Sequence, residues 1–108
     1  MNKVYRQGDV FIREITEAEV PEKLKAVKRD SRGRVVLAEG EVTGHAHRLG
    51  DPASGQVFSV DGELYLDVTA ESASIVHEEH GPITLPRGGY AVRIQREYTP
   101  QEIRRVVD

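Results

Sequence analysis

The sequence predicts an all-β domain, a small jelly roll or barrel-like β-sandwich with one or two short helical turns. Three observations predict it: short runs of Val, Ile, Leu, Tyr and Phe, the Gly, Pro and Asp-Gly punctuation between them, and the scarcity of helical periodicity. Eight or so short strands at nearly regular spacing are typical of sandwiches and barrels. The 108 residues fit a single β domain over 1–108 with one core.

The chain begins with a strand and a connector. Residues 9–15, DVFIREI, follow a Gln-Gly turn and have strand composition. Thr16 and Glu19 have the spacing of a capping box, and Pro21 limits any helix there to about one turn. We therefore expect a connector after the first long strand.

Residues 33–49 are strand material that carries two histidines near its end. Gly40 and Gly44 interrupt this segment, and a bulge or a close backbone approach is the expected reason for the missing side chains. In an extended strand, His45 and His47 point to the same face.

Residues 56–68 predict a β-hairpin. Asp61-Gly62 lies between two β-rich runs and supplies the positive φ angles that a two-residue turn requires. The alternation predicts a buried side made of Phe58, Val60, Leu64, Leu66 and Val68.

The remaining strands are expected at 73–76, 83–85 and 90–98, with a turn at Pro86 and Gly88-Gly89. The last run alternates as a half-buried antiparallel strand does, with Tyr90, Val92, Ile94 and Tyr98 on one face and Arg93, Gln95 and Glu97 on the other. The tail after Thr99 is open between helix and strand.

Composition narrows the classes of function. A net charge of -3 gives no overall attraction to nucleic acid or to an anionic membrane. The absence of cysteine excludes disulfides and thiolate metal sites and agrees with a reducing compartment. No apolar run approaches the roughly 20 residues that span a bilayer, and the first residues lack a signal-peptide core. We expect a soluble cytoplasmic protein.

All the histidines of the chain fall in two short clusters, GHAH and HEEH, which contain His45, His47, His77 and His80. The second pair is three residues apart and converges in a turn, for which Gly81-Pro82 is the expected source. If neighbouring strands bring the two pairs together, four imidazoles can ligate a transition metal ion: zinc, iron, manganese, nickel or copper.

Glu78 and Glu79 lie between the second pair of histidines and are the candidate catalytic carboxylates, as ligands, supporting partners or a general base. The HEEH segment is not the helical zinc-protease motif, which needs histidines four residues apart within a helix. Alternatively, the histidines form a polar site without metal or belong to solvated turns.

A basic segment at 23–34 supports another class of function, a weak nucleic-acid interface. Six of its residues are Lys or Arg, but it has no aromatic platform for bases, so a solvated hairpin is favoured. The six are Lys23, Lys25, Lys28, Arg29, Arg32 and Arg34.

The GHAH motif together with LPRGG at 85–89 resembles the cupin superfamily, small jelly-roll barrels that hold a metal through clustered histidines and a glutamate. By position, the resemblance carries over only to His45 and His47. The glutamate expected downstream is replaced by Arg48 and LGDPASG, and Tyr90 lies where the remaining cupin histidine would be.

The pieces QGDV, GEVTGHAH, HEEHGPI and QREY also look like small uncharacterised proteins of bacterial and phage genomes. Two hypotheses follow. The first is a metal-dependent pocket for a small-molecule ligand, binding or enzymatic. The second is a non-enzymatic interaction or structural module, phage-associated or homo-oligomeric. Neither involves a membrane.

Overall fold

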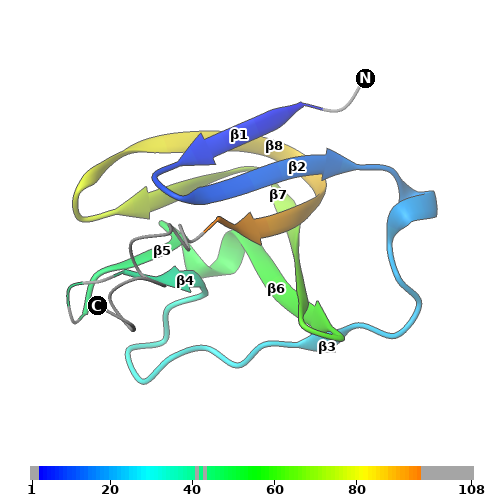
Figure 1. The fold of residues 1–108 in the computed structure, drawn as a ribbon, viewed down its shortest axis with the longest axis horizontal. Helices are drawn as coiled ribbons and strands as arrows, with labels where there is room; N and C mark the ends of the chain where they lie inside the picture. Colours follow the sequence, from blue (N-terminus) through cyan, green and yellow to red (C-terminus); the bar gives the residue numbers. More distant parts are fainter. Residues whose placement is uncertain (1–2, 41, 43, 96–108) are drawn as a thin grey trace, which may run out of the picture.

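The computed structural model describes residues 3–40, 42 and 44–95, which form eight strands and two 3-10 turns (Figure 1). The strands are β1 (Val4–Gln7), β2 (Val10–Ile15), β3 (Lys25–Ala26), β4 (Val36–Glu39), β5 (Ala46–Leu49), β6 (Gly55–Val60), β7 (Glu63–His77) and β8 (His80–Ile94). The 3-10 turns are η1 (Glu17–Glu19) and η2 (Pro52–Ser54). The predicted all-β class is confirmed.

The strands form one antiparallel sheet that curls into a half-barrel (Figure 1). Its main path runs β1-β2-β8-β7-β5-β4, and β6 pairs with both β7 and the short β3. β7 pairs with β6 along its first half and with β5 near its end, so it belongs to two parts of the curled sheet. The β7–β8 hairpin is therefore the centre of the fold.

The prediction of separate short strands at 63–68, 73–76, 83–85 and 90–98 is wrong. These segments merge into two strands of 15 residues each. The register shifts between Val68↔Gly88 and Ser72↔Pro86, so the three residues 69–71 of β7 lie opposite one residue of β8, Arg87. The proline and glycines expected to turn the chain thus lie beside a bulge, which bends paired strands without ending them. Tyr98 and Glu97, with the tail, lie outside the described residues.

The predicted hairpin at Asp61-Gly62 is confirmed. The two residues have φ angles of 48° and 82° and join β6 directly to β7. Its predicted buried side is right for Leu66 and Val68, and Leu64 is half-buried and packs against the core. It is wrong for β6, where Val57 is buried and Phe58 and Val60 are only half-buried. Because Val57 pairs with Leu66, these two share the inner face.

The segment 33–49 is not one interrupted strand. It reverses between β4 and β5, which pair antiparallel across a loop that contains Gly40 and Gly44. Gly44 has φ of +88° in this loop, where glycine is preferred. The predicted connector at 16–24 is confirmed: Glu19 Oε1 accepts a hydrogen bond from the Thr16 N–H at 2.9 Å, closing the capping box of η1.

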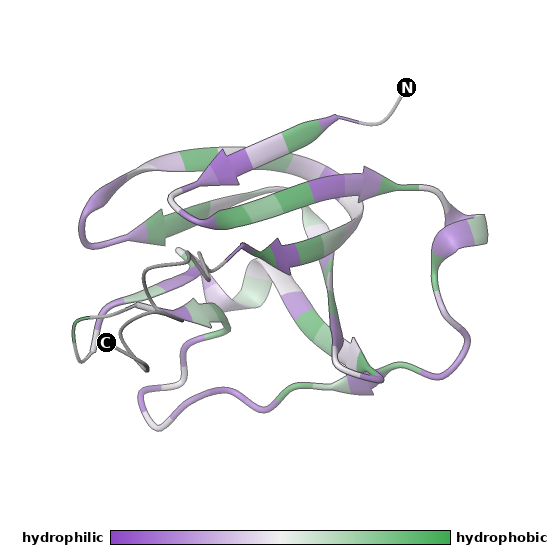
Figure 2. Ribbon diagram, in the orientation of Figure 1, coloured by the Kyte–Doolittle hydropathy of each residue, from purple (hydrophilic) through white to green (hydrophobic). Residues whose placement is uncertain are grey.

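Hydrophobic residues alternate with hydrophilic ones along the strands (Figure 2), and buried apolar side chains form one core cluster. The core contains Val10, Ile12, Val35, Leu37, Leu49, Val57, Leu66, Val68, Ile75, Leu85 and Tyr90. None of the described residues forms a helix long and apolar enough to cross a membrane.

Tyr90 gives the core a pH-sensitive group. It is 1% exposed, and its hydroxyl donates to the Pro86 carbonyl at 2.6 Å. Burial, with smaller contributions from Tyr5 and Glu14, raises the pKa of Tyr90 to about 12. An unfolded tyrosine ionises near pH 10, so the stabilisation is complete below about pH 10 and is lost as the pH rises from 10 towards 12.

We expect Tyr90→Phe to lower the free energy of unfolding by about 1 kcal/mol at pH 8, because the Pro86 carbonyl loses its donor. The variant should also lose less stability than the wild type between pH 10 and 11. Urea unfolding at pH 8, 10 and 11 measures both effects. Parallel pH profiles for the two proteins would contradict the assignment.

Candidate histidine site

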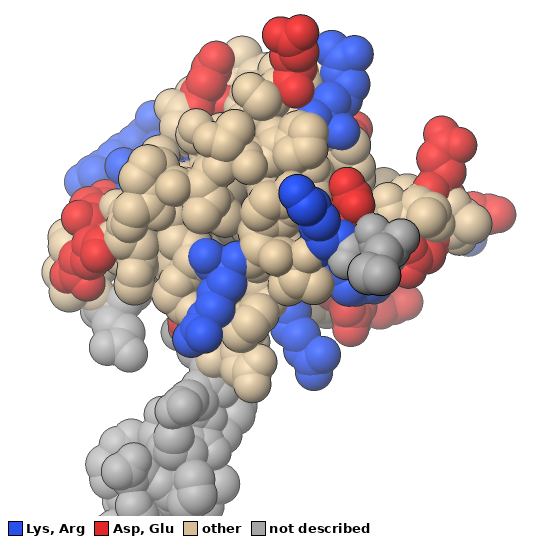
Figure 3. Space-filling view, turned by 90° about the horizontal axis from the view of Figure 1, so that it is seen from above, with Lys and Arg blue, Asp and Glu red and all other residues tan. Residues whose placement is uncertain are grey.

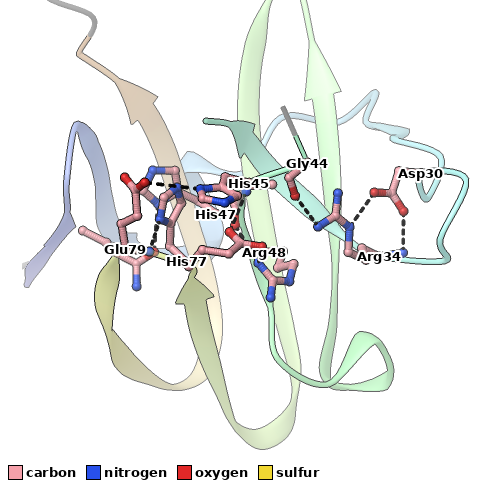
Figure 4. A network of polar contacts seen from close by, with 11 residues as sticks. Asp30, Arg34, Gly44, His45, His47, Arg48, His77 and Glu79 are labelled. Atoms are coloured by element: carbon pink, nitrogen blue, oxygen red, sulfur yellow. Dashed lines mark hydrogen bonds and ion pairs between the residues drawn. The ribbon is translucent and has the colours of Figure 1, made fainter. Parts of the chain in front are cut away.

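The two histidine pairs meet. His47 lies on β5 and His45 immediately before it, whereas His77 ends β7 (Figure 4). His80 begins β8. Ring centroids are 4.3 Å apart for His47–His77, 4.8 Å for His77–His80, 5.7 Å for His47–His80 and 6.0 Å for His45–His77. We call these four residues the histidine cluster. Strand pairing thus joins motifs thirty positions apart in the sequence.

The second histidine pair converges for a different reason from the one predicted. Glu78-Glu79 forms the two-residue turn of the β7–β8 hairpin, and His77 pairs directly with His80 across it. Gly81-Pro82 does not turn the chain. These residues lie within β8 at a register shift, where the two of them face one residue of β7, Val76.

Gln7, at the end of β1, fixes the orientation of His47. Its Nε2 donates to the carbonyls of Ile75 and Gly81, each at 2.9 Å. The amide oxygen therefore faces His47 Nδ1 at 2.8 Å, and a carbonyl oxygen can only accept. His47 must carry a proton on Nδ1, so the neutral imidazole has its lone pair on Nε2. Both residues are 3% exposed.

A different hydrogen bond sets the tautomer of His77. The backbone N–H of Glu79 donates to His77 Nδ1 at 3.0 Å. The Nδ1 lone pair is therefore occupied, and the neutral ring carries its proton on Nε2. His47 and His77 are thus opposite tautomers in contact with each other.

Two carboxylates lie at the edge of the histidine cluster. Glu79 Oε2 is 3.4 Å from His45 Nδ1 and Asp9 Oδ1 is 3.6 Å from His47 Nε2. His45 Nδ1 is buried and, among the residues that the structure describes, has no hydrogen-bond partner, because Glu79 approaches it without hydrogen-bond geometry. A buried polar nitrogen without a partner is costly, and this one lies inside the cluster.

Glu78, the other predicted catalytic carboxylate, holds the site together. It accepts from the Ala46 N–H and from Arg48, both at 3.1 Å, and so ties the β7–β8 turn to β5. Desolvation acts to raise the pKa of Glu78, but the Glu78 and Ala46 N–H groups, Arg48 and His45 outweigh it and lower the pKa to about 2. Such a carboxylate is a poor general base at neutral pH.

Two glycines make room for the imidazoles. A Cβ on Gly8, whose φ is +60°, would lie 2.7 Å from His80 Nε2 and 3.3 Å from His47 Cε1. A Cβ on Gly40 would lie 3.0 Å from both His77 Nε2 and the His45 carbonyl oxygen. The close approach expected at Gly40 is confirmed, and the β1–β2 turn forms another wall of the cluster.

Sequence reasoning did not find Gln7, Gly8 or Asp9 as site residues. The only available signal was the QGD turn after the first β-rich residues, which predicts a turn and nothing about histidines. In the described part of the chain, no group of three or more His, Asp or Glu side chains is arranged to hold a metal ion as it stands.

The basic segment 23–34 bends around Asp30. Arg34 pairs with Asp30 at 2.7 Å and donates to the Gly44 carbonyl at 3.0 Å, which anchors this segment to the loop before His45 (Figure 4). Its remaining Lys and Arg residues are exposed.

On the face shown in Figure 3, acidic and basic side chains are interspersed around an uncharged centre, which gives this face no continuous basic surface.

Residues 6–95 match a protein family described as "Domain of unknown function (DUF8820)". The chain belongs to this family. The matched range contains the whole histidine cluster together with Gln7, Gly8 and Asp9. No curated protein and no solved structure matches the chain. The resemblance to cupins stays a prediction.

Proposed function

We propose that this DUF8820 domain binds a transition metal ion at the histidine cluster. The observation that carries the proposal is the convergence of the four imidazoles, from β5 and the residue before it and from the β7–β8 hairpin, with four ring pairs at centroid separations of 4.3 to 6.0 Å. Imidazole nitrogens are ligands for zinc, iron, copper, nickel and manganese.

The donor atoms support this proposal in two ways. Gln7 holds His47 in the tautomer that has its lone pair on Nε2, which is how a second residue commonly orients a metal ligand. His45 Nδ1 is buried without a hydrogen-bond partner among the described residues, so the interior of the cluster is a place where a further polar or charged group would be accommodated. The residues present therefore fit a metal.

The distances from the carboxylate oxygens of Glu79 and Asp9 to the facing imidazole nitrogens also agree with metal binding. Two atoms bound to one tetrahedral zinc lie about 3.4 Å apart, because each bond is about 2.0 to 2.1 Å. Glu79 and Asp9 lie 3.4 and 3.6 Å from the facing imidazole nitrogens. Since no three donors among the described residues are positioned for an ion as they stand, binding requires imidazole rotations within the cluster.

Of the two predicted assisting carboxylates, Glu79 is the one we propose for a role beside the metal, because Glu78 is held by Ala46 and Arg48. The hypothesis of a metal-dependent pocket adds the expectation that a coordination position stays open for a small molecule. That a reaction takes place at this position is the more specific part of the proposal.

Elemental analysis of protein purified without a histidine tag tests the proposal. We expect about one equivalent of a transition metal, or uptake of one equivalent of Co²⁺ or Zn²⁺ by metal-free protein. A free metal concentration 100 times the dissociation constant should raise the free energy of unfolding by about 2.7 kcal/mol. His45→Ala should weaken binding. A wild-type protein that takes up no metal and gains no stability would contradict the proposal.

A further inference from the structure

We infer that Asp9 is a ligand of the proposed metal ion together with His47 and His80, and that His77 is a positioning residue and not a ligand. This inference rests on the proposed function. It departs from the four-histidine ligand set that the spacing of the motifs predicts.

The first argument is the position of the Nε2 edges of His47 and His80. The point where a Gly8 Cβ would stand is 2.7 Å from His80 Nε2 and 3.3 Å from His47 Cε1, the carbon between Nδ1 and Nε2. His80 therefore presents its Nε2 edge to the β1–β2 turn, and His47 does so too, because its Nε2 lies 3.6 Å from Oδ1 of Asp9 in that turn. Gln7 leaves the lone pair of neutral His47 on this same edge.

The second argument is the position of Asp9, the residue after Gly8. Its Oδ1 is 3.6 Å from His47 Nε2, and its side chain is partly exposed, 43%, so it can adjust by rotation. The β1–β2 turn thus brings a carboxylate to the edge that the two imidazoles share. An ion there would be reached from three elements: the β1–β2 turn, β5 and β8.

The third argument removes His77 from the ligand set. Its Nδ1 accepts the Glu79 N–H at 3.0 Å, so neutral His77 is protonated on Nε2 and has no lone pair left for a metal. To ligate, it would have to give up a hydrogen bond of the hairpin turn. The ring lies 4.3 Å from His47 and 4.8 Å from His80, where it supports both by contact.

Two imidazoles and one carboxylate define the class of ion. This donor set suits iron(II), manganese(II) or zinc, and in each case leaves coordination positions for water or for an oxygen ligand. Four neutral imidazoles would instead close a tetrahedral site. The inference therefore favours an open site over a purely structural one.

Co²⁺ titration of metal-free protein, followed by visible absorption and calorimetry, tests the ligand set. We expect Asp9→Asn and His80→Gln each to weaken Co²⁺ binding by at least tenfold, and His77→Gln by no more than about threefold. Asp67→Asn, the same change at an exposed aspartate of β7, serves as the control and should leave binding unchanged. Asp9 and His80 are not buried, so their variants are expected to fold.

The experiment distinguishes a failure of the proposed function from a failure of this inference. Absence of Co²⁺ binding by the wild type overturns the proposed function and this inference together. Binding by the wild type that survives Asp9→Asn within twofold, or that falls as far in His77→Gln as in Asp9→Asn, overturns the inference and keeps the proposed function. As an independent readout, ¹⁵N spectra should show His77 Nδ1 unprotonated with and without Zn²⁺. Loss of that tautomer on Zn²⁺ addition also overturns the inference.

Discussion

Replacement of Gln7 by leucine is expected to lower the free energy of unfolding by about 3 kcal/mol. Gln7 is 3% exposed, and its amide makes hydrogen bonds to Ile75, Gly81 and His47. Leucine fills a similar volume but leaves these three buried partners without the amide. A buried polar group that loses its partner costs about 1 to 3 kcal/mol. Urea unfolding of metal-free protein measures the loss.

Gln56 offers a matched control for this variant. Its Nε2 also donates to two carbonyls, those of Val27 and Val57, but it is only half-buried and does not contact the histidine cluster. Gln56→Leu should therefore cost about 1 kcal/mol, since water can replace part of what is lost. A loss in Gln7→Leu no larger than in Gln56→Leu would show that the Gln7 amide does not hold the β1 end of the fold.

The variants Gln7→Leu and Gln56→Leu also distinguish an effect on stability from an effect on metal binding. Gln7→Leu should weaken binding of Co²⁺, because His47 is no longer held in one tautomer, whereas Gln56→Leu should leave it unchanged. Gln7→Glu loses both donor bonds but keeps an acceptor on His47 Nδ1. It should therefore be destabilised as Gln7→Leu is, while retaining more of the metal affinity.

Replacement of Gly8 by alanine is expected to cost about 2 kcal/mol and to weaken metal binding at least tenfold. Two effects add. A φ of +60° costs a non-glycine residue about 1 kcal/mol, and the new methyl group would stand 2.7 Å from His80 Nε2. His80 is exposed and can swing away, which limits the cost in stability but moves a proposed ligand. Urea unfolding and Co²⁺ titration measure the two effects.

Gly33→Ala isolates the backbone effect. Gly33 has φ of +77°, and an added Cβ there would meet no atom within 4 Å. It should cost about 1 kcal/mol and leave metal affinity unchanged. If Gly8→Ala binds Co²⁺ as the wild type does, the β1–β2 turn does not form a wall of the metal site, and the role proposed for Asp9 loses its support.

The sequence by itself determined the features that depend on neighbours in the chain. Asp61-Gly62 specifies its hairpin because those two residues tolerate the φ angles that the turn requires. The alternation through Tyr90, Val92 and Ile94 specifies a strand with one buried face. Two histidine pairs in strand-rich segments were enough to predict that the imidazoles would meet, though not which turn would bring them together.

Tertiary structure alone decided register and partners. Short-range sequence patterns do not determine that Val57, and not Phe58, faces inward. The pairing of Val57 with Leu66 of β7 determines it. Pro86 and the following glycines are ordinary turn residues, yet β7 stays paired with β8 past them and the chain bends at a bulge. Gln7 meets carbonyls 68 and 74 residues away. Such contacts depend on the curl of the whole sheet, so they cannot be predicted from short-range sequence patterns.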